Sequence, residues 1–200
     1  MTSLVVDWKE QWALYARDFR DGCAHIDLKP YGSSSILKLS PGAGFGDLSH
    51  PTTRLVLELL APWALHRTVV DVGCGSGILS LAALLLGAKE ALGIDIDEDA
   101  LEHARSNSHL NGLEEKVTYS RELPERVLMA PLVLMNMIFS EQKEAWKCCQ
   151  TSLPKNGEII TSGILKRERS RYLEQAKEWK WQLMDERQDE EWLGFIFKYL

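Results

Sequence analysis

The stretch VVDVGCGSG, residues 69–77, decides the fold of this chain. A short run rich in valine ends in a loop in which every second residue is glycine, and a strongly apolar segment, residues 78–86, follows. Glycine accepts positive φ angles and lets a ligand approach the backbone, and the start of a helix presents backbone N–H groups. The pattern is therefore typical of a strand, a ligand-binding turn and a helix, in that order.

The same alternation of strand and helix continues through the middle of the chain. Strands are predicted at residues 69–72, 91–96, 132–135 and 158–162, and helices at residues 78–86, 99–107, 141–152 and 166–179. This alternation predicts an α/β fold with a doubly wound, Rossmann-like sheet. Two further apolar runs, 181–185 and 192–197, flank a charged turn at 188–190, which predicts a C-terminal antiparallel hairpin at a sheet edge.

The chain before the loop is predicted to be an N-terminal helical extension, residues 1–40, attached to the main domain, residues 41–200. Its apolar residues recur at intervals of three and four, as on one face of a helix: Trp8, Trp12, Tyr15, Ala16 and Phe19. A short strand is expected at residues 36–39. Thr52 and Thr53 are expected to cap the helix that follows.

Composition places the chain among ordinary globular proteins. Its 200 residues are 45% hydrophobic and 26% charged, and its formal net charge is −6. An acidic chain carries no field that attracts nucleic acid, so we expect a protein or small-molecule partner and no direct nucleic-acid contact. No apolar stretch approaches the roughly 20 residues that span a bilayer, and the start lacks a signal pattern, which predicts a cytoplasmic location without membrane contact.

The cysteines give no indication of a metal site. They are Cys23, Cys74, Cys148 and Cys149, and no pair has the two-residue gap of a zinc or redox motif. The adjacent pair Cys148 and Cys149 could act as a redox switch, but buried free thiols in a helix are the commoner case. We therefore expect no metal.

Two acidic residues next to the loop indicate the cofactor class. Asp71 stands at the end of the first strand, and Asp95 at the end of the next one, where a carboxylate can accept hydrogen bonds from ribose hydroxyls. Gly73, Gly75 and Gly77 do not have the G-x-G-x-x-G spacing of dinucleotide sites, and Asp71 would repel a diphosphate. S-adenosylmethionine brings a cationic sulfonium instead, so it is the predicted cofactor. The alternative interpretation is that the glycines form only a tight strand-to-helix turn, and that Asp71 and Asp95 are only polar residues at strand ends.

Further motifs are spread along most of the chain, at residues 7–9, 41–46, 50–53, 71–79, 86–88, 93–97, 107, 111–112 and 162–165. In these motifs the chain resembles the bacterial methyltransferases that modify the eleventh protein of the large ribosomal subunit, the PrmA type. The Phe-Gly loop followed by His-Pro-Thr-Thr, and the later Ser-Gly-Ile-Leu, are the most specific of them. The resemblance implies a class I methyltransferase fold and N-methylation of amine groups of a protein, with a ribosomal protein as the first candidate.

Carried over residue by residue, the resemblance implies that Thr53, Gly73, Asp95 and Asn136 contact the cofactor or lie at the methyl-transfer face. We expect the amide oxygen of Asn136 to orient the acceptor amine, because transfer from an activated methyl donor needs alignment more than a strong base. Phe45, between two glycines, is expected to act as a lid that excludes water. The alternative interpretations are a helix cap for Thr53, a strand end for Asn136 and a core anchor for Phe45.

The chain also departs from the family pattern. Asp47-Leu48 stands where the family usually has Thr-Gly, and Asn136-Met137-Ile138 where it usually has Asn-Ile-Leu. Full-length members carry an N-terminal domain that recruits the ribosomal protein, which about 40 residues before the loop are too few to supply. The alternative functions are a methyltransferase for another protein or a small molecule, a non-catalytic cofactor-binding scaffold, and a nicotinamide oxidoreductase. The oligomeric state is left open.

Overall fold

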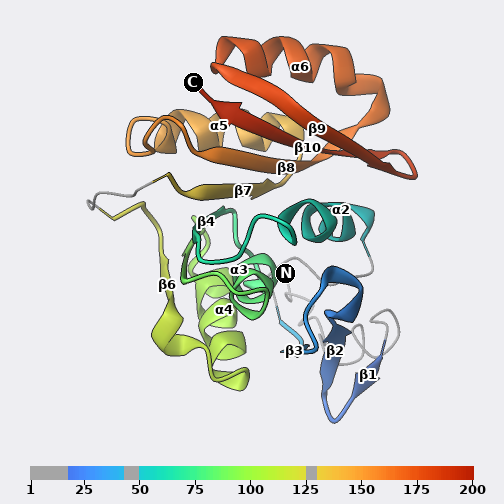
Figure 1. Cartoon of the computed structure of the whole chain (residues 1–200). Coiled ribbons are helices and arrows are strands. Elements are labelled where there is room, and N and C mark those ends of the chain that lie inside the picture. The colour runs from blue at the N-terminus through green and yellow to red at the C-terminus, as the bar shows by residue number, and fades with distance from the viewer. Residues whose placement is uncertain (1–17, 43–49, 125–129) are drawn as a thin grey trace, which may run out of the picture.

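The structure, a computed structural model, describes residues 18–42, 50–124 and 130–200 (Figure 1). Its elements follow in the order β1 (Phe19–Arg20), β2 (Cys23–Asp27), η1 (Lys29–Tyr31), β3 (Ile36–Leu39), α2 (Pro51–Leu60), β4 (Thr68–Val72), α3 (Ile78–Leu85), β5 (Glu90–Ile94), α4 (Glu98–Leu110), η2 (Glu114–Lys116), β6 (Val117–Ser120), β7 (Leu132–Asn136), α5 (Phe139–Cys149), β8 (Glu158–Leu165), η3 (Lys166–Glu168), α6 (Arg169–Glu178), β9 (Trp181–Asp189) and β10 (Trp192–Tyr199). Every strand and helix predicted after residue 50 is present, with shifted ends.

The central seven-stranded sheet has the order β6-β5-β4-β7-β8-β10-β9. The strands from β6 to β8 are parallel, whereas β10 lies antiparallel to both β8 and β9. The chain first winds from β4 outward to β6, then returns to β7 and winds in the other direction. This confirms the doubly wound sheet and the C-terminal antiparallel hairpin, in which β9 forms the sheet edge.

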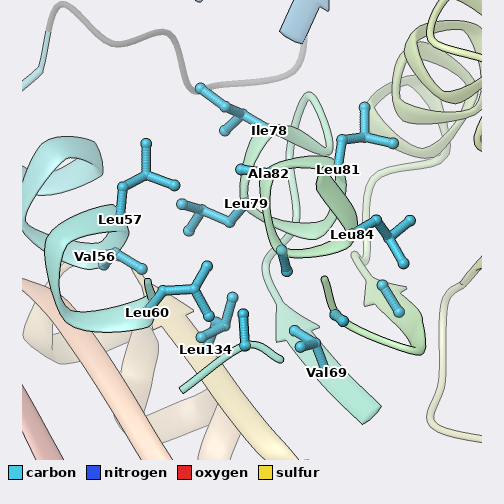
Figure 2. Packing of buried hydrophobic residues seen from close by; sticks show 14 of the residues in the cluster. Val56, Leu57, Leu60, Val69, Ile78, Leu79, Leu81, Ala82, Leu84 and Leu134 are labelled. Atoms are coloured by element: carbon cyan, nitrogen blue, oxygen red, sulfur yellow. The ribbon is translucent and has the colours of Figure 1, made fainter. Parts of the chain in front are cut away.

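Helices cover both faces of the sheet. Successive residues of a strand point to opposite faces, so a fully apolar strand contributes side chains to a core on each side. Val69 of β4 joins a core with α2 and α3, whereas Val70 joins a second core with α5 and α6. Figure 2 shows Leu60 of α2 next to Leu134 of β7, and Leu57 of α2 next to Leu79 of α3, in the first core. Each fully buried aliphatic side chain contributes about 1.5 to 3 kcal/mol. The two cores therefore fix where the strands end, and with them the position of the loops described below.

The N-terminal part differs from the prediction. Phe19 lies in β1 and not in a helix, and β1, β2 and β3 form a separate antiparallel sheet. The cause is the turn at Asp21 and Gly22, whose φ angles of 53° and 77° suit a two-residue hairpin. The strand predicted at residues 36–39 is confirmed as β3, whereas the predicted helical character is wrong at Phe19 and in β2; the part of that helix from Trp8 to Ala16 lies outside the described residues.

The small sheet packs on the main domain. Leu37 and Leu39 of β3 are fully buried in the same core as α2 and α3. The two parts thus share one hydrophobic core in the structure. The domain division at residue 40 stays a prediction.

The predicted cap of α2 is wrong. The helix begins at Pro51, and His50 is its N-cap, with the His50 Nδ1 accepting from the Thr52 N–H at 3.4 Å. Proline suits the first helical position because no N–H is needed there. Thr52 and Thr53 therefore lie inside the first turn, which leaves the hydroxyl of Thr53 available for another role.

One strand of the sheet was not predicted. β6 forms the edge opposite β9, and Tyr119 is its single fully buried residue. Four residues with one buried position give little periodicity to recognise. Within the described ranges, no helix combines the length and the apolar character that crossing a membrane requires.

Candidate active site

The predicted site residues that the structure describes gather at one edge of the sheet. β5, β4 and β7 are adjacent and parallel; Asp95 follows β5, the glycine loop of residues 73–77 follows β4, and Asn136 ends β7. The winding of the sheet reverses between β4 and β7. The carboxyl ends of the strands at such a reversal form the ligand crevice of open α/β sheets.

The glycine loop adopts the backbone that its sequence predicts. Gly73, Gly75 and Gly77 have φ angles of 73°, 53° and 81°, a region that favours glycine. The loop is also tightly packed, because a Cβ atom on Gly77 would overlap the hydroxyl of Tyr119. A larger residue at Gly77 would therefore require Tyr119 to move.

The N–H groups of the glycine loop are largely engaged within the protein. Four of them donate to nearby oxygens: Gly73 and Cys74 to the Ile94 carbonyl, Gly77 to the Cys74 carbonyl, and Gly75 to Asp95 Oδ2 at 3.0 Å. N–H groups available to a ligand were predicted at the start of α3, and among them the Ser80 N–H donates to Asp71 Oδ2. The carboxylate of Asp95 occupies the place that a phosphate would need on the Gly75 amide.

Asp71 is a buried carboxylate that joins β4 to α3. Its Oδ2 accepts hydrogen bonds from the Ser80 N–H at 3.0 Å and from the Ser80 hydroxyl at 2.7 Å. Burial raises the pKa of Asp71 from 3.8 to about 6, and the nearby Asp95 carboxylate adds to the rise while the Ser80 bonds oppose it. The side chain is 1% exposed, so it acts on the site through its charge and through α3. Direct cofactor contact by Asp71 stays a prediction.

Asp95 is half-buried between the glycine loop and the start of α4. Besides the bond to Gly75, its Oδ1 accepts from the Asp97 N–H at 3.1 Å. Each carboxylate oxygen has a second lone pair, so Asp95 can still accept bonds from a ligand's hydroxyls. The next residue, Ile96, is 82% exposed because β5 ends at Ile94, two residues before the predicted strand end. An exposed aliphatic side chain beside this carboxylate is a surface on which a flat base can pack; sequence reasoning placed it inside the strand.

Thr53 lies at the same edge of the sheet. The ring of His50, which caps α2, contacts the Trp192 ring at 5.1 Å between centroids, and Trp192 pairs with Leu165, the last residue of β8. The first turn of α2 is therefore near the carboxyl end of β8. Thr53 is fully buried, and its Oγ1 has no hydrogen-bond partner among the described residues.

Asn136 presents a second unpartnered oxygen. Its Oδ1 is buried and lacks a hydrogen-bond partner within the described part of the chain. An unsatisfied buried polar atom costs about 1 to 3 kcal/mol, so its retention needs an explanation. Ile138, two residues further along the chain, is 50% exposed. Contacts of Thr53 and Asn136 with a cofactor stay predictions.

Asn107 links the glycine loop to the chain that precedes α2. Its Nδ2 donates to the Ser76 carbonyl at 2.9 Å, and its Oδ1 accepts from the N–H of Ser40 at 2.9 Å and the hydroxyl of Ser40 at 2.8 Å. The residue is fully buried on α4. Sequence reasoning singled it out only through the family resemblance, because a buried asparagine on a helix has no periodic signal.

The segment from Ser40 to Gly42 is held further by His103. The Nε2 of His103 lies 2.7 Å from the Ser40 carbonyl, and burial lowers the pKa of its ring. A Cβ on Gly42 would overlap this ring. Phe45, the predicted lid, lies outside the described residues, so its role stays a prediction.

Comparison with known proteins gives a consistent result. The family model for ribosomal protein L11 methyltransferase (PrmA) matches residues 6–199. The ribosomal protein L11 methyltransferase of Pasteurella multocida is 37% identical over 166 residues, which cover 80% of this chain and 57% of the relative. That of Thermoanaerobacter pseudethanolicus is 34% identical over 199 residues, covering 95% of this chain and 64% of the relative. The chain thus spans less than two thirds of the length of these curated relatives.

A solved structure shows the same similarity in three dimensions. The ribosomal protein L11 methylase from Lactobacillus delbrueckii subsp. bulgaricus superposes with a TM-score of 0.71 and 28% identity. The superposition covers 83% of this chain and 86% of that chain. The similarity therefore extends over most of both chains.

Proposed function

This chain belongs to the ribosomal protein L11 methyltransferase family, and on this premise we propose that it transfers methyl groups from S-adenosylmethionine to amine nitrogens of a ribosomal protein. L11 is the first candidate because the relatives carry its name. The family supports the reaction type. The site supports the choice of cofactor and the way in which the acceptor is aligned.

One observation carries the choice of cofactor. Four N–H groups of the glycine loop donate within the protein, and the Asp95 carboxylate sits on the Gly75 amide. A diphosphate needs free N–H groups at this loop and is repelled by carboxylates. A sulfonium nucleoside has no phosphate and is attracted by the negative charge of Asp71 and Asp95. This favours S-adenosylmethionine over a nicotinamide dinucleotide.

The residues present fit this cofactor. Asp95 would accept from the ribose hydroxyls, and Ile96 would pack on the adenine. Thr53 Oγ1, a buried atom without a partner among the described residues, would bind a polar group of the amino-acid part. When bound, S-adenosylmethionine supplies a methyl group on a cationic sulfur, which needs no further activation.

Asn136 would align the acceptor. Its unpartnered Oδ1 accepts an N–H of the neutral amine and thereby fixes the direction of the nitrogen lone pair. Alignment of this kind contributes up to about 7 to 11 kcal/mol when both reactants are held in a reactive geometry. The proton that the amine loses can pass to water.

The test is methyl transfer from S-adenosylmethionine labelled in its methyl group. The protein is incubated with purified L11 of the same organism, and the product is analysed by mass spectrometry. We expect label on L11 and a mass gain in multiples of roughly 14 Da on amine-bearing residues. Label on a different protein of the cell extract would retain the reaction and change the substrate. Binding of the cofactor without transfer to any extract component would contradict the proposal and favour a scaffold.

A further inference from the structure

A buried polar cluster holds the turn between β7 and α5, residues 137–138. Its centre is Gln142 of α5, which is fully buried. The Nε2 of Gln142 donates to the carbonyls of Met137 and Ser162, both at 2.8 Å. The backbone N–H of Gln142 donates to the Ile138 carbonyl at 3.0 Å. A single residue therefore binds both carbonyls of the two-residue turn.

The other end of the Gln142 side chain is held equally firmly. Its Oε1 accepts from the Tyr172 hydroxyl at 2.6 Å, and the Tyr172 oxygen lies 2.9 Å from Thr161 Oγ1. Burial raises the pKa of Tyr172, so the phenol keeps its proton as a donor. Both amide hydrogens and the amide oxygen of Gln142 are thus engaged, and a satisfied buried network of this kind favours one arrangement.

The turn is enclosed from the β8 side as well. Gly163 has a φ of +91°, and a Cβ atom at this position would overlap the carbonyl group of Met137. The backbone of β8 therefore lies directly against the turn. The Met137 carbonyl is enclosed between Gln142 and Gly163 and is withdrawn from any ligand.

The consequence appears one residue earlier, at Asn136. The carbonyls of Met137 and Ile138 are both used by Gln142, whereas Asn136 Oδ1 has no partner among the described residues. We propose that Gln142 is a positioning residue for methyl transfer: it fixes the turn so that the Asn136 amide oxygen is the one acceptor presented to the substrate amine. Gln142 acts through Asn136 and touches neither substrate nor cofactor. The inference rests on the proposed methyltransferase function.

The effect of losing Gln142 follows from geometry. Without its amide, the enclosed Met137 carbonyl loses its hydrogen bond, and the turn that carries Asn136 is free to shift. The turn also loses its link to α6 through Tyr172. A displacement of about 1 Å between reacting groups can lower a rate about 100-fold, so the turnover number is the quantity to measure.

The first test is Gln142→Met, which keeps the length and burial of the side chain and removes its hydrogen bonds. We expect kcat with labelled S-adenosylmethionine and L11 to fall by about tenfold to 100-fold, with the dissociation constant of S-adenosylmethionine within about twofold of the wild type. Gln175→Met on α6 is the matched control. The Gln175 side-chain amide donates to Glu178 on the protein surface, so removal of this bond should leave kcat unchanged.

Tyr172→Phe tests the same network if Gln142→Met does not fold. It removes one hydroxyl and leaves the Gln142 amide in place, so we expect a smaller fall in kcat, about threefold to tenfold. The decisive readout is a double-mutant cycle under single-turnover conditions. If Gln142 acts through Asn136, Gln142→Met causes no further loss in the Asn136→Ala background.

The outcomes separate this inference from the proposed function. If the wild-type protein transfers no methyl group to L11 or to an extract protein, the proposed function fails and the inference falls with it. If the wild type is active and the network variants keep its kcat, the positioning role alone is overturned. It is also overturned if Gln142→Met lowers the rate by the same factor with and without Asn136, because that pattern describes general structural damage.

Discussion

The two loops that follow the neighbouring strands β4 and β7 differ in how their polar groups are bonded. The glycine loop uses four of its N–H groups within the protein, and Asp71 and Asp95 accept bonds from the main chain around it. The β7–α5 turn uses its two carbonyls in the same manner but leaves Asn136 Oδ1 without a partner among the described residues.

This difference suggests that the glycine loop after β4 serves cofactor binding and that the turn after β7 serves the methyl acceptor. A loop whose amides are already bonded binds by shape and charge, so it can select a cationic nucleoside but cannot hold a diphosphate. Under the proposed function, the turn that leaves Asn136 Oδ1 unpartnered provides an acceptor for the substrate amine. Cofactor affinity should therefore depend on the first loop and turnover on the second.

The largest expected effect comes from Asn136→Ala. Removing the unpartnered amide oxygen should lower kcat by about 10² to 10³-fold, a loss comparable to that of one preorganised hydrogen-bonding group in other enzymes. The dissociation constant of S-adenosylmethionine should change by no more than a few-fold. Steady-state methylation and calorimetry measure the two quantities. Equal losses of cofactor affinity and of kcat would contradict the assignment of binding to the glycine loop and of turnover to the β7–α5 turn.

Gly163→Ala should mainly affect the free energy of unfolding. A Cβ at this position overlaps the Met137 carbonyl, and the φ of +91° is unfavourable for alanine, so we expect a loss of about 3 kcal/mol. Gly112→Ala is the matched control, because Gly112 also has a positive φ of +64° but open space around it. About 1 kcal/mol is expected there. Chemical denaturation of both variants provides the comparison, and equal losses would show that the β8 backbone does not constrain the turn.

Asp95→Ala should weaken the affinity for S-adenosylmethionine by about tenfold to 100-fold, because charge-assisted bonds to the ribose and to the Gly75 amide are lost. At saturating cofactor kcat should change little. Asp97→Ala is the control: Asp97 caps α4 through a 3.0 Å bond from the Asp99 N–H, so its loss lowers stability without touching the crevice. Unchanged affinity in Asp95→Ala, measured by calorimetry, would remove this carboxylate from the site.

The smallest effect concerns the charge of Asp71. Folding raises its pKa from 3.8 to about 6, so the folded protein holds this proton more tightly than the unfolded chain does. Ionisation of Asp71 therefore lowers the free energy of unfolding as the pH rises through this window, and the loss is complete above about pH 6. Asp71→Asn should be more stable than the wild type by about 1 to 2 kcal/mol at pH 7.5 and show no advantage at pH 4.

The same substitution reports on function. S-adenosylmethionine is cationic at sulfur and S-adenosylhomocysteine is not, so Asp71→Asn should weaken the first more than the second. Denaturation curves at the two pH values and parallel calorimetric titrations measure both effects. A variant that is less stable than the wild type at pH 7.5 would contradict the cost assigned to the buried charge.

The fold could be predicted where local patterns are strong. Residues 69–77 place a strand, a glycine turn and a helix next to one another, and the later strands and helices alternate clearly enough to indicate the doubly wound sheet. The β1–β2 hairpin was missed although Asp21-Gly22 is a typical hairpin turn, because the aromatic spacing before it favoured a helix. β6 was missed because it is short and only Tyr119 is fully buried.

The site could be predicted where its residues follow strand ends. Asp71 and Asp95 were predicted in this way, since carboxyl ends of parallel strands meet at one edge, whereas Asn136 was predicted through the family resemblance. The same reasoning could not find Asn107 and Gln142, because each is a buried polar residue in the middle of a helix. Their hydrogen-bond partners, such as Ser40 for Asn107 and Met137 for Gln142, come from distant elements or turns. Hydrogen bonds between distant elements leave no periodic pattern in a sequence.

The most direct test of the central claim is a calorimetric comparison of two ligands on the wild-type protein. The account predicts saturable binding of S-adenosylmethionine and no detectable binding of NADH, because the amides beside Asp95 are already bonded and the local charge is negative. Saturable binding of NADH together with no heat from S-adenosylmethionine would contradict it.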